Sequence, residues 1–201
     1  MKKNLFLLIM TVAMSVTAVA ADTAKIPNDP KHQEMMKAWT AYATPGAPHK
    51  ILADMAGNWK YTSKWWESAD GKPQESKGTS SMKMILGGRF LQHDTKGLAM
   101  GMPFEGMGLV GYDNIKNKYE TIWLDNMGTG VMHGTGDFDA ATKTLTDSGE
   151  FSCPMKKERK STYRGEWKVI DKNNMTYTMH GPGMTDNKEF KMMEMTYKRV
   201  K

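Results

Sequence analysis

The chain has 201 residues, with 28 lysines and arginines, 22 aspartates and glutamates and a formal charge of +6 at pH 7. Charges of both signs are interspersed, and the densest basic run, residues 156–160, contains an acid and no nucleic-acid-binding motif, which argues against a nucleic-acid partner. The single cysteine, Cys153, excludes a fold held by internal disulfides. The thiol is expected to be half-buried and unreactive or, alternatively, to form an intermolecular disulfide.

Residues 1–21 have the pattern of a secretory signal peptide. Lys2 and Lys3 form a positive start, the apolar segment 5–14 follows, and residues 18–20 supply the small side chains of a cleavage site. The apolar run is shorter than the roughly 20 residues that a membrane-spanning helix needs, and no later segment resembles a span. We therefore expect a periplasmic or secreted protein whose mature chain begins directly after this segment.

Residues 22–48 are predicted to form a polar lead and one amphipathic helix. Asp29 followed by Pro30 indicates a helix start, because the missing N–H of proline costs nothing at the first helical position. The Pro-Gly-Ala-Pro segment 45–48 ends the helix, and a second short helix is expected over about residues 49–55. Apolar residues in the first helix recur at i, i+4 and i+7 and share one face: Met35, Trp39 and Tyr42.

From Gly57 onward the hydrophobic period changes from 3.6 to 2, which is typical of half-buried strands. Turn signals, including Gly87-Gly88, separate the strands at roughly the 8–12-residue spacing of a sandwich or barrel, and no βαβ alternation is present. Closure removes the exposed edges of a twisted sheet, so residues 49–201 are predicted to be an all-β domain, a single antiparallel up-and-down barrel. Ten strand-like segments are found: 59–65, 78–86, 89–95, 104–111, 119–125, 131–138, 143–151, 161–169, 175–180 and 189–198.

Several short motifs resemble the bacterial domain-of-unknown-function 1579 family: GNW at 57–59, LGGRF at 86–90, MPFEG at 102–106, GYD at 111–113, WLD at 123–125 and MEMTYKR at 193–199. The resemblance covers about residues 49–199. It implies a lipocalin-like β-barrel and brings no established activity or catalytic residues. The Gly-x-Trp opening and the late arginine also resemble lipocalins, which implies that Arg199 packs over Trp59 and closes one barrel end.

No hydrolase, metalloprotease or nucleotide-binding motif is present, and we interpret the chain as a protein without catalytic activity. Cys153 and either His133 or His180 could act as nucleophile and base only if folding brought them together. Glu194 is a carboxylate within the otherwise apolar closing strand. The histidines of the predicted strands, which include His93, lack the close spacing of a zinc site. A single inward histidine could ligate haem iron, but surface or hydrogen-bonded histidines are the favoured interpretation.

Methionine is unusually frequent, with 20 residues in the whole chain. Its thioether sulfur suits Cu(I), and a glycine-rich segment, residues 97–108, is predicted to be a loop in which Met100, Met102 and Met107 could converge on copper. Methionine also fills irregular gaps in cores. We favour packing, with no metal or cofactor, and keep copper handling as the alternative.

The predicted inward face of the strands is rich in aromatic residues: Trp59, Tyr61, Trp65, Tyr119, Trp123, Tyr163 and Trp167. Barrels of eight or more strands can hold a small ligand, and aromatic walls with few polar groups are typical of apolar-ligand pockets. We predict an interior that binds a small apolar or amphipathic molecule through Trp59, Tyr61, Trp65, Met82, Met84, Tyr119, Trp123 and Met193. The alternative is that these side chains fill the barrel completely and the protein is purely structural.

Overall fold

The computed structural model describes residues 29–184 and 186–200, so the predicted signal peptide lies outside the described part. Two helices, α1 (Pro30–Ala43) and α2 (Ala47–Met55), precede the strands. Ten strands follow: β1 (Gly57–Trp65), β2 (Gln74–Ile85), β3 (Phe90–Ala99), β4 (Met102–Asp113), β5 (Lys118–Asp125), β6 (Met132–Asp139), β7 (Thr144–Ser152), β8 (Lys160–Asp171), β9 (Asn174–Pro182) and β10 (Glu189–Arg199). All ten correspond to the segments predicted from hydrophobic alternation.

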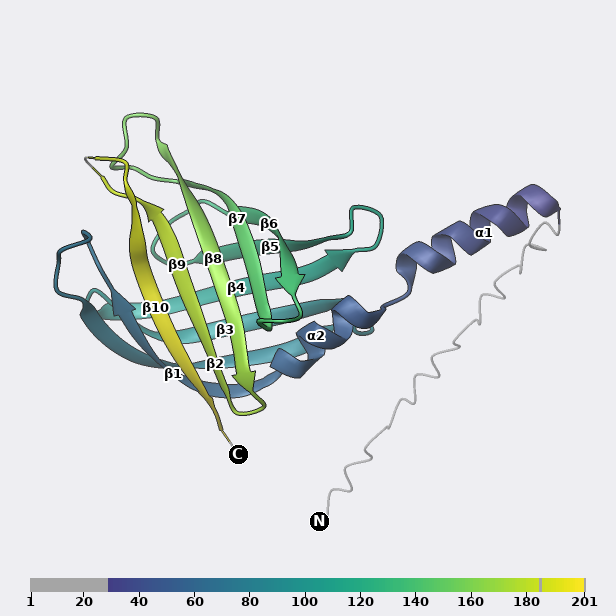
Figure 1. Cartoon of the computed structure of the whole chain (residues 1–201), viewed down its shortest axis with the longest axis horizontal. Helices are drawn as coiled ribbons and strands as arrows, with labels where there is room; N and C mark the ends of the chain where they lie inside the picture. The colour runs from purple at the N-terminus through teal and green to yellow at the C-terminus, as the bar shows by residue number, and fades with distance from the viewer. Residues whose placement is uncertain (1–28, 185, 201) are drawn as a thin grey trace, which may run out of the picture.

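The strands form one closed barrel in which each strand pairs with its sequence neighbours and β1 pairs with β10 (Figure 1). Every pairing is antiparallel, and the seam between β1 and β10 runs in register from Trp59↔Arg199 to Trp65↔Met193. The predicted antiparallel up-and-down barrel is therefore confirmed. Closure gives each central backbone group a partner on both sides and leaves no exposed edge.

The connections agree with the predicted turn chemistry in most places. Leu86, Gly87 and Gly88 have φ values of 50°, 67° and 81°, a left-handed run that glycine adopts without a steric penalty, and this run forms the corner between β2 and β3. The connection between β1 and β2 is longer than a two-residue hairpin turn. It spans residues 66–73, and the Gly71 N–H donates to the Ser68 carbonyl within it.

Helix α2 covers one end of the barrel, which we call the capped end (Figure 1). Leu52 and Met55 of α2 are buried among the inward side chains of the strands. The Trp59 indole donates to the Met55 carbonyl at 3.1 Å, and the Arg199 guanidinium lies 4.1 Å from the centre of the Trp59 ring. Arg199 also donates to the carbonyls of Asp54 and Ala56. The Arg-over-Trp contact implied by the lipocalin resemblance is therefore present.

Helix α1 begins where the sequence predicted, with the Asp29 carboxylate accepting from the His32 N–H at 3.0 Å. It extends away from the barrel (Figure 1) and has no buried residue, so its apolar face remains exposed, with Trp39 at 60%. The Asn114 side chain, in the turn between β4 and β5, donates to the Tyr42 and Thr44 carbonyls and anchors its C-terminal end. Within residues 29–184 and 186–200, no helix is long and apolar enough to cross a membrane.

Candidate functional site

A layer of aromatic rings spans the middle of the barrel. His93 on β3 lies 5.6 Å, ring centre to ring centre, from Trp123 on β5 and 5.5 Å from Trp167 on β8. Trp167 in turn contacts Tyr177 at 4.7 Å and Tyr197 at 5.3 Å. Strands β3 and β8 lie on opposite sides of the barrel, so these contacts cross its whole width. We call these five residues the aromatic layer.

His93 is a packing member of this layer. Its side chain is buried, and Nε2 lies 2.8 Å from the Thr95 hydroxyl. Burial lowers the pKa of His93 to about 4, and the nearby Asp94 opposes this only in part. The imidazole is therefore neutral at neutral pH, which suits a ring enclosed by other rings.

The other residues considered for chemistry lie apart from one another. His133 is on the outer face, 3.0 Å from the Glu120 carboxylate, and Glu194 is also on the outer face, paired with Lys191 at 2.5 Å. Cys153 is buried in the connection between β7 and β8. In the part of the chain that the structure describes, no three His, Cys, Asp or Glu side chains are grouped to hold a metal ion.

The predicted methionine loop is instead a hairpin, so the expectation of a loop was wrong. β3 continues to Ala99, β4 begins at Met102, and only residues 100 and 101 form the turn. Met102 and Met107 stand five residues apart on one strand, about 17 Å at ~3.4 Å per residue. Met100, Met102 and Met107 therefore do not form a single copper site in this fold. The glycines in this segment make room for a large aromatic ring that packs against the strand, and they do not indicate a flexible loop.

The aromatic layer divides the interior into two parts. Toward α2, the largest inward side chains are almost fully enclosed, with Trp59 at 2% exposure and Met82 at 3%, while Phe138 and Val169 are partly buried. On the far side, which we call the open half, Tyr163 and Met179 are buried, but other inward side chains are only half-buried: Trp65, Phe104, Trp123, Met132, Phe151 and Met193. These inward residues keep contact with solvent, so this end of the barrel is less covered than the end beside α2.

The Trp123 ring forms the boundary between the layer and the open half. A Cβ atom at Gly106 would lie 2.3 Å from the ring, so only glycine lets the indole lie flat against β4. The indole Nε1 donates to the Asp125 carboxylate at 2.8 Å, and Phe104 stacks on the ring at 6.4 Å with an 18° tilt. These contacts hold the ring in place at the boundary between the layer and the open half.

Five of the eight predicted ligand-binding residues belong to the packed core on the capped side: Trp59, Tyr61, Met82, Met84 and Tyr119. Their neighbours enclose them, and the Tyr119 hydroxyl donates to the Pro48 carbonyl and so anchors α2. Trp65 and Trp123 face the open half, and Met193 packs against the same core while it stays partly exposed. The candidate site is therefore smaller than predicted, because alternation identifies the inward face of a strand but not the depth along the barrel.

The interior also contains a buried carboxylate that the sequence analysis did not single out. Asp147 on β7 is 6% exposed, and its Oδ2 accepts from the Thr121 hydroxyl at 2.8 Å and from the Tyr163 hydroxyl at 2.9 Å. Burial raises the pKa of Asp147, and the two hydrogen bonds oppose that shift. Alternation with Leu145 placed this position inward, so the residue could have been found from the sequence.

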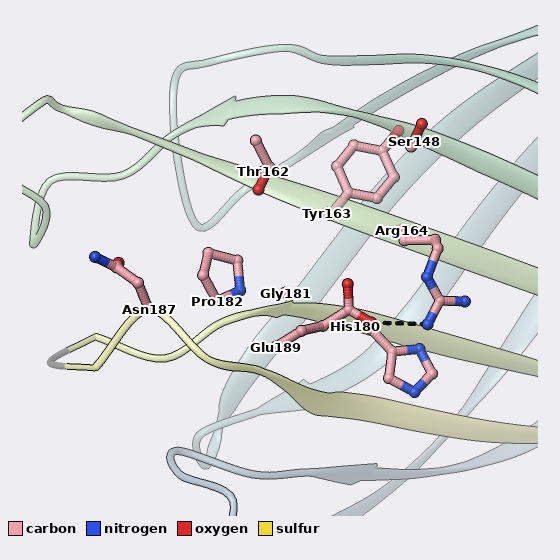
Figure 2. Close-up of a pocket in the computed structure, with 9 residues that line it drawn as sticks. All are labelled: Ser148, Thr162, Tyr163, Arg164, His180, Gly181, Pro182, Asn187 and Glu189. Carbon is pink, nitrogen blue, oxygen red and sulfur yellow. Dashed lines mark hydrogen bonds and ion pairs between the residues drawn. The ribbon is translucent and has the colours of Figure 1, made fainter.

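A recess of about 360 Å³ on the outer wall of the barrel is another candidate location for a ligand (Figure 2). Arg164 and Glu189 form an ion pair across it at 2.9 Å, and Arg164 also pairs with Glu166. The charges that line this recess thus neutralise one another, whereas the Asp147 carboxylate inside the barrel has no cationic partner among the described residues. A second recess of about 470 Å³ lies beside α2, with Phe138 and Val169 in its wall.

The geometry defines a lipocalin-like barrel, and comparisons with known proteins agree with this fold. The family described as "protein of unknown function (DUF1579)" matches residues 44–199, and the chain belongs to this family. The crystal structure of Rv2717c from M. tuberculosis has a TM-score of 0.58 at 12% identity and covers 79% of this chain and 100% of its own. The S-type phycobiliprotein lyase CPES from Guillardia theta has a TM-score of 0.54 at 7% identity and covers 78% and 94%. No curated protein matches. At these identities the structural likeness shows the fold alone.

Proposed function

We propose that this chain is an exported binding protein that holds a small apolar or amphipathic molecule in the open half of its barrel. The observation that carries the proposal is the contrast across the aromatic layer. Inward rings and methionines are enclosed on the capped side, but Trp65, Phe104 and Met193 keep solvent contact on the other side. Accessible apolar side chains inside a barrel stabilise a guest that covers them.

The expected affinity is moderate. A guest that buries about 200 Å² of apolar surface gains about 5 kcal/mol at ~25 cal/mol/Å². Ordering the guest and the interior side chains reduces this gain, so a micromolar Kd is expected for a simple alkyl compound. Methionine at positions 132 and 193 adapts to guests of different shape, which favours a class of ligand over a single compound.

Titration followed by tryptophan fluorescence tests this proposal. Decanol, decanoate and an isoprenoid alcohol should each change the emission saturably, because Trp123 borders the open half. Trp123→Phe should remove most of that change, whereas Trp39→Phe, on the exposed helix α1, should leave it intact. If no compound gives a saturable change, the interior is filled in solution and the barrel has a structural role.

Export rests on the first 21 residues, which combine a basic start, an apolar segment and small residues at the expected cleavage position. Mass analysis of the protein purified from its native source should give Ala21 or Asp22 as the first residue. A native protein that keeps residues 1–20 would contradict export through a cleaved signal.

A further inference from the structure

Asp147 is a buried acid without a cation. Its neighbours in register are Gly136 on β6 and Gly165 on β8, which carry no charge. Thr121 and Tyr163 provide its hydrogen bonds, and among the described residues no lysine, arginine or histidine forms an ion pair with it or lowers its pKa. Burying an ionised carboxylate without a cation is costly, so the site favours a positive charge supplied from outside.

Two unpaired oxygen atoms converge beside this carboxylate. A Cβ atom at Gly165 would lie 2.6 Å from Asp147 Oδ1 and 3.0 Å from the Tyr177 hydroxyl oxygen. Neither oxygen takes part in a hydrogen bond within the described part of the chain. Asp147 Oδ1 and the Tyr177 hydroxyl oxygen therefore converge directly over Gly165, where no side chain separates them.

The remaining titratable groups near these two oxygens are uncharged. Tyr163 and Tyr177 are the other titratable groups that face Asp147. Burial raises the pKa of both hydroxyls, and the nearby Asp147 charge adds to this, so both tyrosines are neutral at physiological pH. Gly165 pairs with Met179, and Met179 pairs with Met193 of the open half.

We propose that Asp147 and Tyr177 bind the protonated amine of an amphipathic ligand whose apolar part lies in the open half. The ammonium group donates to Asp147 Oδ1 and to the Tyr177 hydroxyl oxygen. Thr121 and Tyr163 hold the carboxylate in position through Oδ2. This inference rests on the proposed function and adds to it the chemical class of the ligand, an alkyl or aryl amine in place of a fatty acid or an alcohol.

Calorimetric titration of the full-length mature protein with decylamine, decanol and decanoate at pH 7.5 tests the inference. Decylammonium should bind at least about tenfold more tightly than decanol, because hydrogen bonds between charged groups are the stronger ones. Asp147→Asn should reduce decylamine affinity to the level of decanol and leave decanol affinity unchanged. The matched control is Asp137→Asn, which removes the same charge from an exposed outer-face residue paired with Lys118, and it should change neither affinity.

Gly165→Ala provides a second variant that keeps every charge. Its methyl group would lie 2.6 Å from Asp147 Oδ1 and 3.0 Å from the Tyr177 hydroxyl oxygen and must displace them, so decylamine affinity should fall about tenfold while decanol affinity is retained. This variant gives the same test if Asp147→Asn does not fold. Equal affinities for decanol and decylamine, or a preference that survives both variants, would overturn the amine site and leave the proposed function standing. Absence of binding by all three compounds would overturn both.

Discussion

The capped end and the open half of this barrel are built from the same alternating strands but differ in how completely their inward side chains are covered. At the capped end, α2 and the Trp59–Arg199 contact enclose a cluster of buried inward side chains, as in an ordinary protein core. Beyond the aromatic layer no helix among the described residues covers the interior, and rings such as Trp65 remain half-buried. One end of the barrel therefore provides stability, and this allows the other end to stay accessible.

The largest expected effect is on stability at the capped end. Trp59→Ala should lower the free energy of unfolding by about 3–5 kcal/mol, because it leaves a cavity under Arg199 and removes the hydrogen bond to Met55. Trp65→Ala, the same change in the open half, should cost less than about 2 kcal/mol, because that ring is only half-buried. Urea denaturation of both variants measures the difference. Equal losses would contradict the division of the barrel into two parts.

A second prediction concerns the aromatic layer. His93 has a pKa of about 4 in the folded protein, below the ~6.5 expected when unfolded. The unfolded chain therefore binds the proton first, and stability should fall as the pH drops from about 6.5 to 4, by up to about 3 kcal/mol. His93→Gln should flatten this part of the stability curve relative to the wild type. His133→Gln, on the outer face, should leave this part of the curve unchanged. A similar flattening by both variants would show that the aromatic layer is open to water.

Much of this architecture could be predicted from the sequence. Alternation located all ten strands, and closure was inferred from the number of strands and the short links between them. The depth of each inward residue could not be predicted, because it depends on strand register and on where α2 lies. The contact of His93 with Trp167 joins opposite walls of the barrel, and no local pattern reports such a pairing.

One wrong expectation, and one feature that the sequence could not predict, have specific physical causes. Residues 97–108 were predicted to be a loop because glycine is frequent there, but Gly106 is glycine to make room for the Trp123 ring within a strand. Helix α1 was correctly located, yet the partner of its apolar face could not be inferred, since periodicity shows a face and not what covers it. In the described structure that face is exposed.

A third prediction tests how the capped end is closed. Arg199→Met should cost about 2 kcal/mol, because it removes the cation over Trp59 and the hydrogen bonds to Asp54, Ala56 and Lys172 while keeping much of the apolar stem. Lys198→Met is the matched control on the exposed face of the same strand and should cost less than about 0.5 kcal/mol. The melting temperatures of the two variants in thermal unfolding should therefore differ clearly. Similar melting temperatures would show that α2 is held without this arginine.

The smallest expected effect is at the opposite end. Cys153 lies in the connection between β7 and β8, where its N–H donates to the Arg159 carbonyl at 3.0 Å. That bond involves only the backbone, so Cys153→Ser should retain it. Although the thiol is buried, it lies outside the main hydrophobic cluster, and the substitution should change the free energy of unfolding by less than about 1 kcal/mol. Urea denaturation under reducing conditions measures this. A loss of several kcal/mol would mean that the accessible end contains a core of its own, and that the contrast between the two ends is one of degree.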